Sequence, residues 1–398
     1  MTSAKIASLL LVLIGVFALW GATSCRERAI TFERSAEAGA LPSSGAPGAR
    51  RGAPEPKKVL SPAVPAAKRV RVQLPREHEA FTVAVISDLN ASYGSRWYPE
   101  SVHRAVDRLI ELDPDLVLGT GDMVAGQSAG LDYGGMWEAF HTVVSDRLFD
   151  AGIAFAPTPG NHDASGYPQY ENERAWYEWA WSYRMPEVDY VSAEALPFRY
   201  AFVARNVLFV SLDATVARPM QQEQREWLRD VLRAHADVSA TIVYGHLPLQ
   251  PFAEGRRWDT INDPSLEQLL VDEGVDLYLS GHHQAYYLGR HGGLRMLSTG
   301  CLGNGVRTLL GDTQPSFKTI VLLHIAPDGT IAVETLTGEN FDLVVQNELL
   351  PPSVGEGLHR VVRDSEVAPP MLARQRDDDG GDWDRLEAEM TLRARMME

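Results

Sequence analysis

Cysteine is nearly absent from this chain of 398 residues, which contains only Cys25 and Cys301. The two are far apart in sequence, so they can build neither a disulfide framework nor a thiolate metal site. Cys301 is expected to be a small buried residue. A metal site in this chain would therefore have to use nitrogen and oxygen ligands.

Basic residues are also fewer than acidic ones. The chain has 37 Lys and Arg against 53 Asp and Glu, which gives a formal net charge of −16 at pH 7. This charge argues against nucleic acid bound on a basic face, and no protein partner can be inferred. If the substrate carries phosphate, its charge has to be met locally, by metal ions or by a few placed side chains.

No apolar run at the N-terminus reaches the roughly 20 residues that span a bilayer comfortably. A short positive start is followed by the apolar run Ile6–Trp20 and by small residues before Cys25, which indicates a secretory signal over residues 1–25. A signal anchor retained in the membrane is the alternative. Ala22-Thr23-Ser24-Cys25 resembles the lipobox of bacterial lipoproteins, although Ala22 replaces the usual leucine. We therefore expect an exported protein on the periplasmic or cell-surface side, anchored to the membrane by this segment or by a lipid on Cys25.

Periodic apolar patterns are missing from two further stretches. Residues 26–77 are rich in Ala, Pro, Gly and Ser, which predicts a disordered tether with a mean reach of roughly 40 Å. Residues 351–398 contain the acidic run Asp377–Asp382 and are expected to form a charged C-terminal tail. The folded domain is therefore predicted at residues 78–350, and a hydrophobic content of 45% suits a soluble globular core.

Within that domain, short apolar runs alternate with amphipathic ones, which is the pattern of an α/β layered domain. The expected strands are Phe81–Ile86, Asp115–Leu118, the apolar run Ile153–Pro159, Phe198–Ala204, Val207–Leu212, Ile242–Tyr244, Val275–Leu279, Lys318–Ile325 and Thr330–Leu336. The expected helices are Pro99–Leu112, Gly135–Phe149, Gln221–His235 and Ser265–Glu273.

Polar side chains follow five of these strands. The five segments are Ser87-Asp88-Leu89-Asn90, Gly119-Thr120-Gly121-Asp122, Gly160-Asn161-His162-Asp163, Gly245-His246 and Ser280-Gly281-His282-His283-Gln284. Each segment alone is readily explained as an ordinary turn. Ligand sites in open α/β sheets, however, gather at the carboxyl ends of strands. Five ligand-type segments at five strand ends favour a metal site over five unrelated turns.

The ordered set resembles the blocks of the calcineurin-like metallophosphoesterases, which run Asp-x-His, Gly-Asp, Gly-Asn-His-Asp/Glu, Gly-His and Gly-His-x-His. The match extends from Asp88 to Gln284, most of the predicted folded domain. The resemblance implies an α/β fold of the metallophosphoesterase type, a double β-sheet sandwich flanked by helices. It also implies a site for two divalent metal ions at one end of the sandwich.

Seven residues would hold these ions if the resemblance is carried over by position. Asp122 would bridge the two ions, and one ion would also be held by Asn161, His246 and His282. The other ion would also be held by Asp88, Asn90 and Gln284. His162 would be the general acid or transition-state stabiliser beside the leaving group, and Asp163 would orient His162 or pair with it.

Two of these positions depart from the family pattern. Asn90 and Gln284 stand where the first and last blocks have histidine, and both fall on the same ion. Imidazole suits zinc, iron and manganese, whereas carboxylate and amide oxygens suit manganese, magnesium or calcium. We therefore expect an unequal pair, with one tightly held ion and one weaker, harder ion. His283 could substitute as a ligand, but it occupies a variable position of the family, and a role outside the ligand set is expected for it.

The implied activity is metal-dependent hydrolysis of phosphoesters. Two cations about 3.5–4 Å apart would clamp the phosphate oxygens and generate a metal-bound hydroxide as the nucleophile, while His162 assists the leaving group. Two alternatives remain at this point. Loss of two histidines could leave a membrane-tethered, non-catalytic binding protein, and the spacing also allows metal-dependent hydrolysis of a non-phosphate ester.

Aromatic residues near the blocks could wall a substrate pocket or belong to the core. They are Trp97, Tyr98, Tyr167, Tyr170, Tyr286 and Tyr287. Tyr93 lies five residues beyond Asp88 and could reach the weaker metal site.

Overall fold

The computed structural model describes residues 81–364. The expected signal at residues 1–25, the expected tether at residues 26–77 and residues 365–398 of the expected tail lie outside the described residues. No helix between residues 81 and 364 combines the length and the apolar character needed to cross a bilayer.

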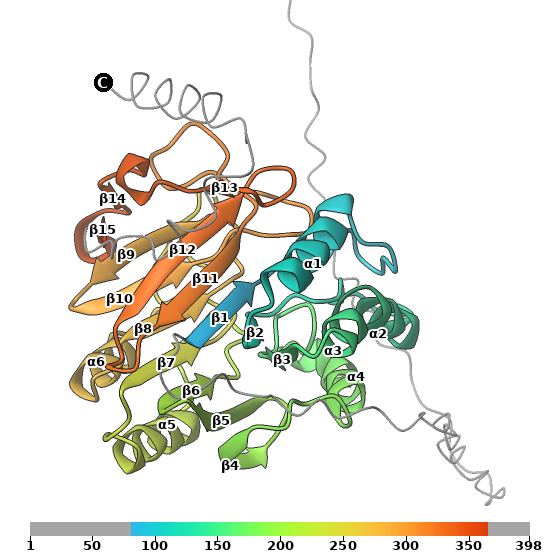
Figure 1. Cartoon of the computed structure of the whole chain (residues 1–398), viewed down its shortest axis with the longest axis horizontal. Coiled ribbons are helices and arrows are strands. Elements are labelled where there is room, and N and C mark those ends of the chain that lie inside the picture. Colours follow the sequence, from blue (N-terminus) through green and yellow to red (C-terminus); the bar gives the residue numbers. More distant parts are fainter. Residues whose placement is uncertain (1–80, 365–398) are drawn as a thin grey trace, which may run out of the picture. The chain divides into compact units, whose positions relative to one another are not determined.

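Two β-sheets stack face to face in the described part of the chain (Figure 1). The first has six strands among residues 81–364, in the order β13 (Leu343–Val344), β12 (Ile331–Thr337), β11 (Ile320–Ile325), β1 (Phe81–Ile86), β2 (Leu116–Gly119) and β3 (Ala154–Pro157). Strands β1, β2 and β3 run parallel, with Val83 opposite Leu116 and Leu116 opposite Ala154. Their carboxyl ends therefore reach the same edge of the sheet.

The second sheet carries the other strands of residues 81–364. Its order is β14 (Ser353–Val354), β15 (Val361–Arg363), β9 (Tyr287–His291), β10 (Leu294–Ser298), β8 (Leu277–Ser280), β7 (Ala240–Tyr244), β6 (Val207–Ser211), β5 (Arg199–Ala204) and β4 (Asp189–Ala195). Strands β6, β7 and β8 are parallel. The carboxyl ends of β7 and β8 thus lie side by side as well.

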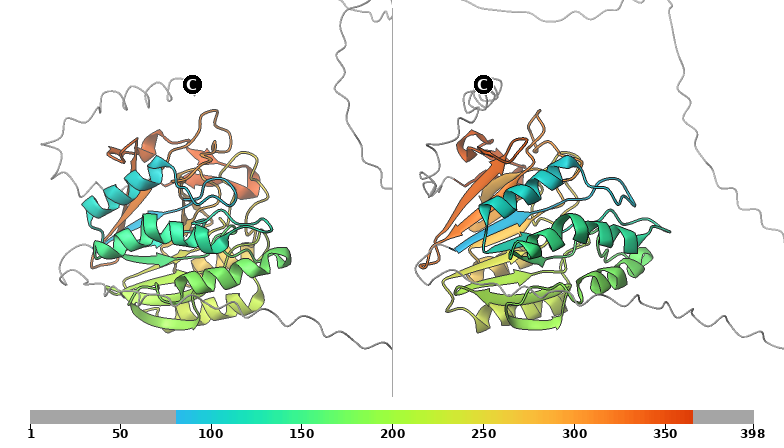
Figure 2. Two further views of the ribbon diagram at one scale, coloured as in Figure 1. Left: turned by 90° about the vertical axis from the view of Figure 1, so that its right-hand side faces the viewer. Right: turned by 45° about the vertical axis from the view of Figure 1, so that its right-hand side comes forward.

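Helices cover the outer faces of both sheets. Four of them, α1 (Glu100–Leu112), α2 (Tyr133–Phe140), α3 (Asp146–Asp150) and α4 (Glu171–Trp181), lie over the first sheet, as Figure 2 shows. The other two α-helices of the described part, α5 (Gln222–Ala234) and α6 (Pro264–Asp272), pack against the second sheet. A π-helical turn, His141–Ser145, joins α2 to α3. The predicted helix Gly135–Phe149 is therefore present, with this turn inserted.

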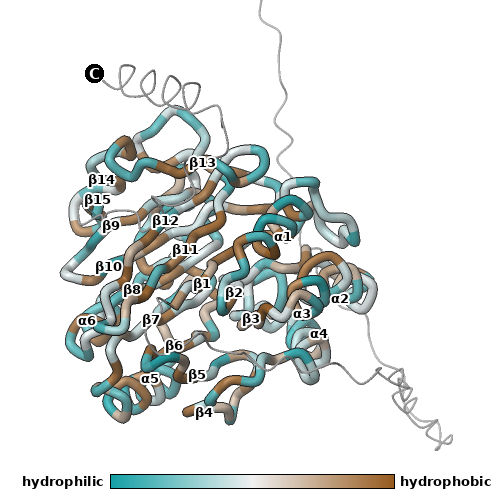
Figure 3. The backbone as a smooth tube through the Cα atoms, in the orientation of Figure 1, coloured by the Kyte–Doolittle hydropathy of each residue, from teal (hydrophilic) through white to brown (hydrophobic). Residues whose placement is uncertain are grey.

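Successive side chains along the strands point to opposite faces of the sheet, and this divides the hydrophobic core into two layers. Val83 and Val85 of β1 pack between the sheets, whereas Ala84 and Ile86 of the same strand pack under α1 and α2. This is the period of two expected for a strand buried on both faces. Figure 3 shows hydrophobic residues concentrated along the strands. The double-sheet sandwich flanked by helices is confirmed.

The folded part continues beyond the boundary expected at residue 350. Strand β15 pairs with β9, with Val362 opposite Arg290. Asp364 is buried and accepts hydrogen bonds from Arg295 and Arg290. The sequence pattern missed this extension because β14 and β15 are two and three residues long, too short for an apolar period. Residues 351–364 therefore belong to the domain and not to the tail.

Candidate metal centre

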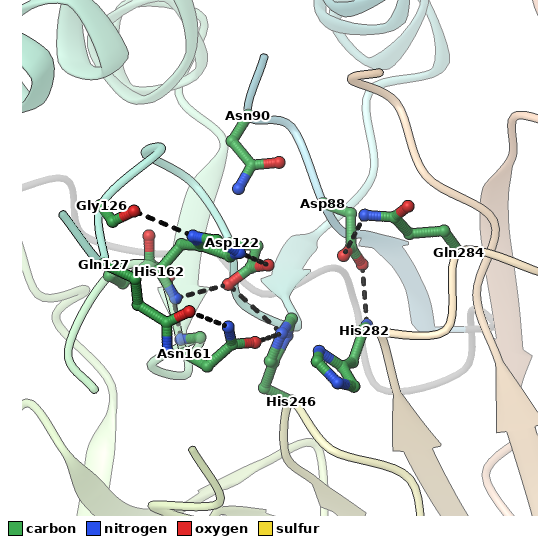
Figure 4. Close-up of polar contacts among 12 residues, drawn as sticks. Asp88, Asn90, Asp122, Gly126, Gln127, Asn161, His162, His246, His282 and Gln284 are labelled. Carbon is green, nitrogen blue, oxygen red and sulfur yellow. Dashed lines mark hydrogen bonds and ion pairs between the residues drawn. The ribbon is translucent and has the colours of Figure 1, made fainter. Parts of the chain in front are cut away.

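Side chains from five strand ends meet at one edge of the sandwich (Figure 4). Asp88, Asp122 and Asn161 follow β1, β2 and β3 of the first sheet, and His246 and His282 follow β7 and β8 of the second. These ends converge because the parallel strands of both sheets point to the same edge. The five strand ends predicted from the sequence are thus brought together.

The backbone at this edge adopts conformations that ordinary turns rarely need. Asp88, Asp122, His282 and Gln284 have φ angles of 50°, 55°, 62° and 53°. The left-handed region costs a residue other than glycine roughly 1–3 kcal/mol and is concentrated at functional sites. Four such residues in the predicted blocks support a functional role for this edge.

Two block glycines allow the loops to approach one another. A Cβ atom on Gly160 would lie 2.1 Å from the backbone nitrogen of Asp122. A Cβ atom on Gly281 would lie 2.0 Å from Oγ of Ser87. Any other residue at either position would push the strand ends apart, so these glycines set the size of the site.

Asp122, His246 and His282 form a compact group of potential ligands. One ligand atom from each lies within 4.8 Å of the others. Nε2 of His246 is 3.2 Å from Oδ1 of Asp122 and 2.9 Å from Oδ1 of Asn161. Two imidazoles, a carboxylate and an amide oxygen around one point fit a transition-type divalent cation.

Two neighbouring groups orient these ligands. Nδ1 of His246 lies 2.8 Å from the carbonyl oxygen of Thr120 and donates to it, which leaves Nε2 free to bind a cation. Nδ2 of Asn161 donates to Oε1 of Gln127 over 3.1 Å, so that Oδ1 faces the site. The sequence pattern predicts neither Thr120 nor Gln127 as part of the site. Thr120 stands inside the second block, but no sequence signal marks Gln127.

The electrostatics of the group favour a bound cation. Burial and the nearby Asp122 raise the pKa of Asp88 above its ordinary value. Burial lowers the pKa of His246, but Asp122 and Asp88 outweigh it and raise this pKa to about 9. Burial and the neighbouring His246 hold the pKa of His282 well below 6.5, which keeps this imidazole in the neutral, ligating form. Two buried carboxylates close together need positive charge between them.

The Asp88 side of the site is arranged differently. The carboxylate of Asp88 accepts hydrogen bonds from Oγ of Ser87 (2.6 Å), the backbone nitrogen of His282 (3.0 Å) and Nε2 of Gln284 (3.2 Å). Oε1 of Gln284 is buried and has no hydrogen-bond partner within residues 81–364. A cation bound here would displace Nε2 of Gln284 from Asp88 and attract Oε1 of Gln284 instead. Once the Gln284 amide has rotated in this way, the oxygen ligands on this side fit a hard cation.

Asn90 presents its oxygen to the same side. Its Nδ2 donates to the carbonyl oxygen of Val124 over 3.2 Å. In Figure 4 the amide oxygen of Asn90 lies on the side toward Asp88. Neither Asn90 nor Gln284 offers an imidazole, and their role as ligands stays a prediction.

His162 lies at the open edge of the site. Its backbone nitrogen donates to Oδ1 of Asp122 over 2.9 Å, and its ring Nδ1 lies 3.0 Å from the carbonyl oxygen of Gly126. Its Nε2 is 4.0 Å from Oδ2 of Asp122, and the side chain is 20% exposed. Nε2 is thus the ring atom available to a substrate.

Asp163 has different partners from the expected ones. Its carboxylate is fully buried and accepts hydrogen bonds from the backbone nitrogens of Val124 and Gly160, each over 2.9 Å. The ring of His162 is held by the Gly126 carbonyl instead. The turn at Gly160 directs the Asp163 carboxylate back onto its own backbone and away from the imidazole. Asp163 therefore ties the second block to the third and does not pair with His162.

Three of the six aromatic candidates for a pocket wall are core residues. Tyr98, Tyr286 and Tyr287 are buried. Trp97 and Tyr93 are each 64% exposed, and the Tyr93 ring lies 5.3 Å from the ring of His162. Tyr93 thus stands beside His162, and its reach to the weaker metal position stays a prediction.

His283 is not placed as a ligand. Its Nδ1 accepts a hydrogen bond from the backbone nitrogen of Phe252, and its Nε2 donates to the carbonyl oxygen of Asp259, each over 3.0 Å. Both ring nitrogens are therefore occupied in fixing the segment between these two residues.

The fold and the site together are those of a metallophosphoesterase. Residues 81–286 match the sequence profile of the family described as calcineurin-like phosphoesterase, and this chain belongs to that family. Metal-dependent hydrolysis of phosphoesters is typical of its members. None of the curated proteins compared matches this chain.

Several solved structures resemble the chain in fold. GAP50, the anchor in the inner membrane complex of Plasmodium, is 13% identical, with a TM-score of 0.44 over 67% of this chain and 88% of that one. A dimetal phosphatase from Danio rerio is 14% identical, with a TM-score of 0.43 over 67% and 98%. Vps29 from Entamoeba histolytica, complexed with Zn²⁺, is 14% identical, with a TM-score of 0.31 over 64% and 92%.

Proposed function

We propose that this protein hydrolyses phosphoesters at the centre formed by the five strand ends. The observation that carries the proposal is the group of Asp122, His246 and His282, whose ligand atoms lie within 4.8 Å of one another. Beside it stands His162, partly exposed and fixed through Nδ1 and its backbone nitrogen. A cation site next to an accessible imidazole meets the two needs of ester hydrolysis, activation of the phosphate and protonation of the leaving group.

The cations would polarise the phosphate oxygens and make a water molecule acidic at neutral pH. In the proposal, Asp122, Asn161, His246 and His282 hold one zinc-, iron- or manganese-type ion. Asp88, Asn90, Gln284 and the shared Asp122 hold a weaker, harder ion such as manganese, magnesium or calcium. The hydrogen bonds that already occupy the Asp88 carboxylate support this inequality.

His162 serves the leaving oxygen. Because Nδ1 donates to the Gly126 carbonyl, Nε2 carries a proton in the imidazolium form and can transfer it to the departing alkoxide. The carbonyl fixes the ring so that this proton points to the open site. Asp163 holds the loops together and takes no part in the proton transfer by His162, since both of its carboxylate oxygens accept backbone hydrogen bonds.

A non-catalytic, membrane-tethered binding protein is the second candidate. The observation that favours it is the Asp88 carboxylate, which is already engaged by three donors. The intact placement of His162 and of the four residues around the first ion supports the enzyme instead.

We further propose that the protein is exported and acts on the outer side of the cytoplasmic membrane. The support lies in the apolar run Ile6–Trp20 and the lipobox-like Ala22–Cys25. Metabolic labelling with a radioactive fatty acid tests the anchor. Label in the wild-type chain and none in Cys25→Ser supports lipidation, and equal label in both contradicts it.

Hydrolysis by the full chain tests the activity. p-Nitrophenyl phosphate and bis(p-nitrophenyl) phosphate, each with added Mn, Mg, Zn or Fe, distinguish monoesterase from diesterase action. Turnover of either ester that is lost in Asp122→Asn supports the proposal. No turnover with any metal, in a protein that remains folded, favours the binding protein.

A further inference from the structure

Two arginines from different loops lie beside the Asp88 side of the centre. The segment 301–307 runs along the first block, because the backbone nitrogens of Leu302 and Gly303 donate to the carbonyl oxygens of Ser87 and Asp88 over 3.1 and 2.7 Å. At the end of this segment the backbone nitrogen of Arg307 donates to the carbonyl oxygen of Gln284 over 3.1 Å. Arg307 is therefore anchored to the last block of the site.

The second arginine comes from the loop between β7 and α6. His283 fixes this loop through Phe252 and Asp259, and Arg256 lies between these two points. The loop is joined to the first segment, since the backbone nitrogen of Glu254 donates to the carbonyl oxygen of Thr308 over 2.9 Å. A second backbone bond, from the nitrogen of Leu310 to the carbonyl oxygen of Phe252 over 2.8 Å, joins the same two segments and brings the backbone of Arg256 close to that of Arg307.

Their charges act on each other and on the site. Burial is the main cause of the lowered pKa of Arg307, and the positive charge of Arg256 lowers this pKa further. The negative charges of Asp88 and Asp259 act on Arg307 in the opposite direction. The two guanidinium groups therefore form one positive field next to the Asp88 carboxylate.

The carboxylates of Asp88 and Asp259 act on the charge of Arg307, but neither forms an ion pair with it. It is half-buried, its Nε has no hydrogen-bond partner, and none of the ion pairs among residues 81–364 includes it. Arg256 is paired with Asp259. Holding an unpaired, partly desolvated cation next to another cation is unfavourable, and in a chain with a net charge of −16 carboxylates are plentiful. Such an arrangement is characteristic of a site whose counter-ion is a ligand.

We propose that Arg307, assisted by Arg256, binds a second anionic group of the substrate on the Asp88 side of the metal centre. The substrate is then a phosphoester that carries another phosphate or carboxylate group, and the guanidinium fork binds either oxyanion through paired N–H donors. This inference rests on the proposed hydrolysis for the identity of the first group. Arg307 is a specificity-determining residue in this scheme, because it contacts the part of the substrate that does not react.

Phosphonates test the site without relying on turnover, because their P–C bond is not an ester. Calorimetry on the metal-loaded full chain at constant ionic strength compares methylphosphonate with bisphosphonates whose spacers have two to four carbons. We expect the best bisphosphonate to bind wild type at least about tenfold more tightly than methylphosphonate. Arg307→Gln should remove this gain and change the Kd of methylphosphonate less than about threefold.

Arg257→Gln is the matched control, because Arg257 is the next residue of the same loop but faces Glu356 on the surface. It should retain the gain. The proposal is overturned if wild type shows no preference for any bisphosphonate, if Arg307→Gln keeps the preference, or if Arg257→Gln loses it equally. If the binding pattern holds but no ester is hydrolysed, the anion site stands and the proposed hydrolysis fails.

Discussion

The backbone nitrogen of His162 donates a hydrogen bond to Oδ1 of Asp122 over 2.9 Å. The residue that would serve the leaving group is thus held by the residue that would bridge the two ions. This link explains why the third block must pack so closely on the second that only glycine fits at position 160. It also means that a change at Asp122 displaces His162, whereas a change in the His162 side chain leaves Asp122 in place.

Replacement of His162 by Ala should separate chemistry from metal binding. We expect kcat to fall by roughly 10²- to 10⁴-fold for an alkyl phosphate, the usual contribution of general acid catalysis. The loss should be smaller for p-nitrophenyl phosphate, because nitrophenolate leaves without a proton. Steady-state kinetics with both esters and the metal content of the purified variant provide the measurement. An equal loss for both esters would remove the role assigned to His162.

Restoring histidine on the Asp88 side should tighten the second ion. Asn90→His combined with Gln284→His replaces two amides with imidazoles next to Asp88. We expect wild type to retain about one ion per chain after gel filtration in metal-free buffer, and the double variant to retain about two. Elemental analysis provides the count, with His246→Ala as the variant that should lose the tight ion. Two tightly held ions in wild type would contradict the unequal pair.

Asp163→Asn should loosen the loops and leave the chemistry of His162 intact. An amide offers one acceptor oxygen where the carboxylate offers two, so one of the two backbone donors, on Val124 or Gly160, is left unpaired. We expect the free energy of unfolding to fall by about 1–3 kcal/mol, with weaker retention of the metal. Asp132→Asn, at an exposed helix start, is the control and should cost less. Urea denaturation of both variants measures the difference, and equal stabilities would refute the structural role of Asp163.

His141 should make stability fall in acid. Burial and the nearby Arg184 hold its pKa well below 6.5, so the folded protein keeps it neutral while the unfolded chain takes up a proton below about pH 6.5. Stability that is present above pH 6.5 is therefore lost as the pH falls. We expect His141→Phe to reduce the slope of unfolding free energy against pH by up to about 1.4 kcal/mol per unit. Denaturation curves between pH 5 and 8 measure the slope, and an unchanged slope would contradict the assignment.

The sequence predicts the parts of the site that are local to strand ends. Asp88, Asp122, Asn161, His246 and His282 each follow a run of buried residues, and parallel strands bring such positions to one edge. The resemblance to the family adds support, because these residues occur along the chain in the same order as the family's blocks. These five side chains could therefore be placed together before any coordinates were known.

Contacts between loops could not be predicted in the same way. Gln127 orients Asn161 from a loop whose backbone enters the left-handed region, and Asp163 turns back onto the Gly160 backbone. Arg307 reaches the site through a hydrogen bond to Gln284, a relation that no spacing in the sequence records. The same holds for β15, which pairs with β9 across about seventy residues of chain.

The central claim is that hydrolysis depends on the cation held by Asp122, Asn161, His246 and His282. The most direct test is a titration of phosphoester turnover against added metal in the full chain after chelator treatment. We predict no turnover without metal, its return as metal is added, and no return in His246→Ala at the same metal concentration. Turnover in the metal-free protein, or full recovery in His246→Ala, would contradict the account.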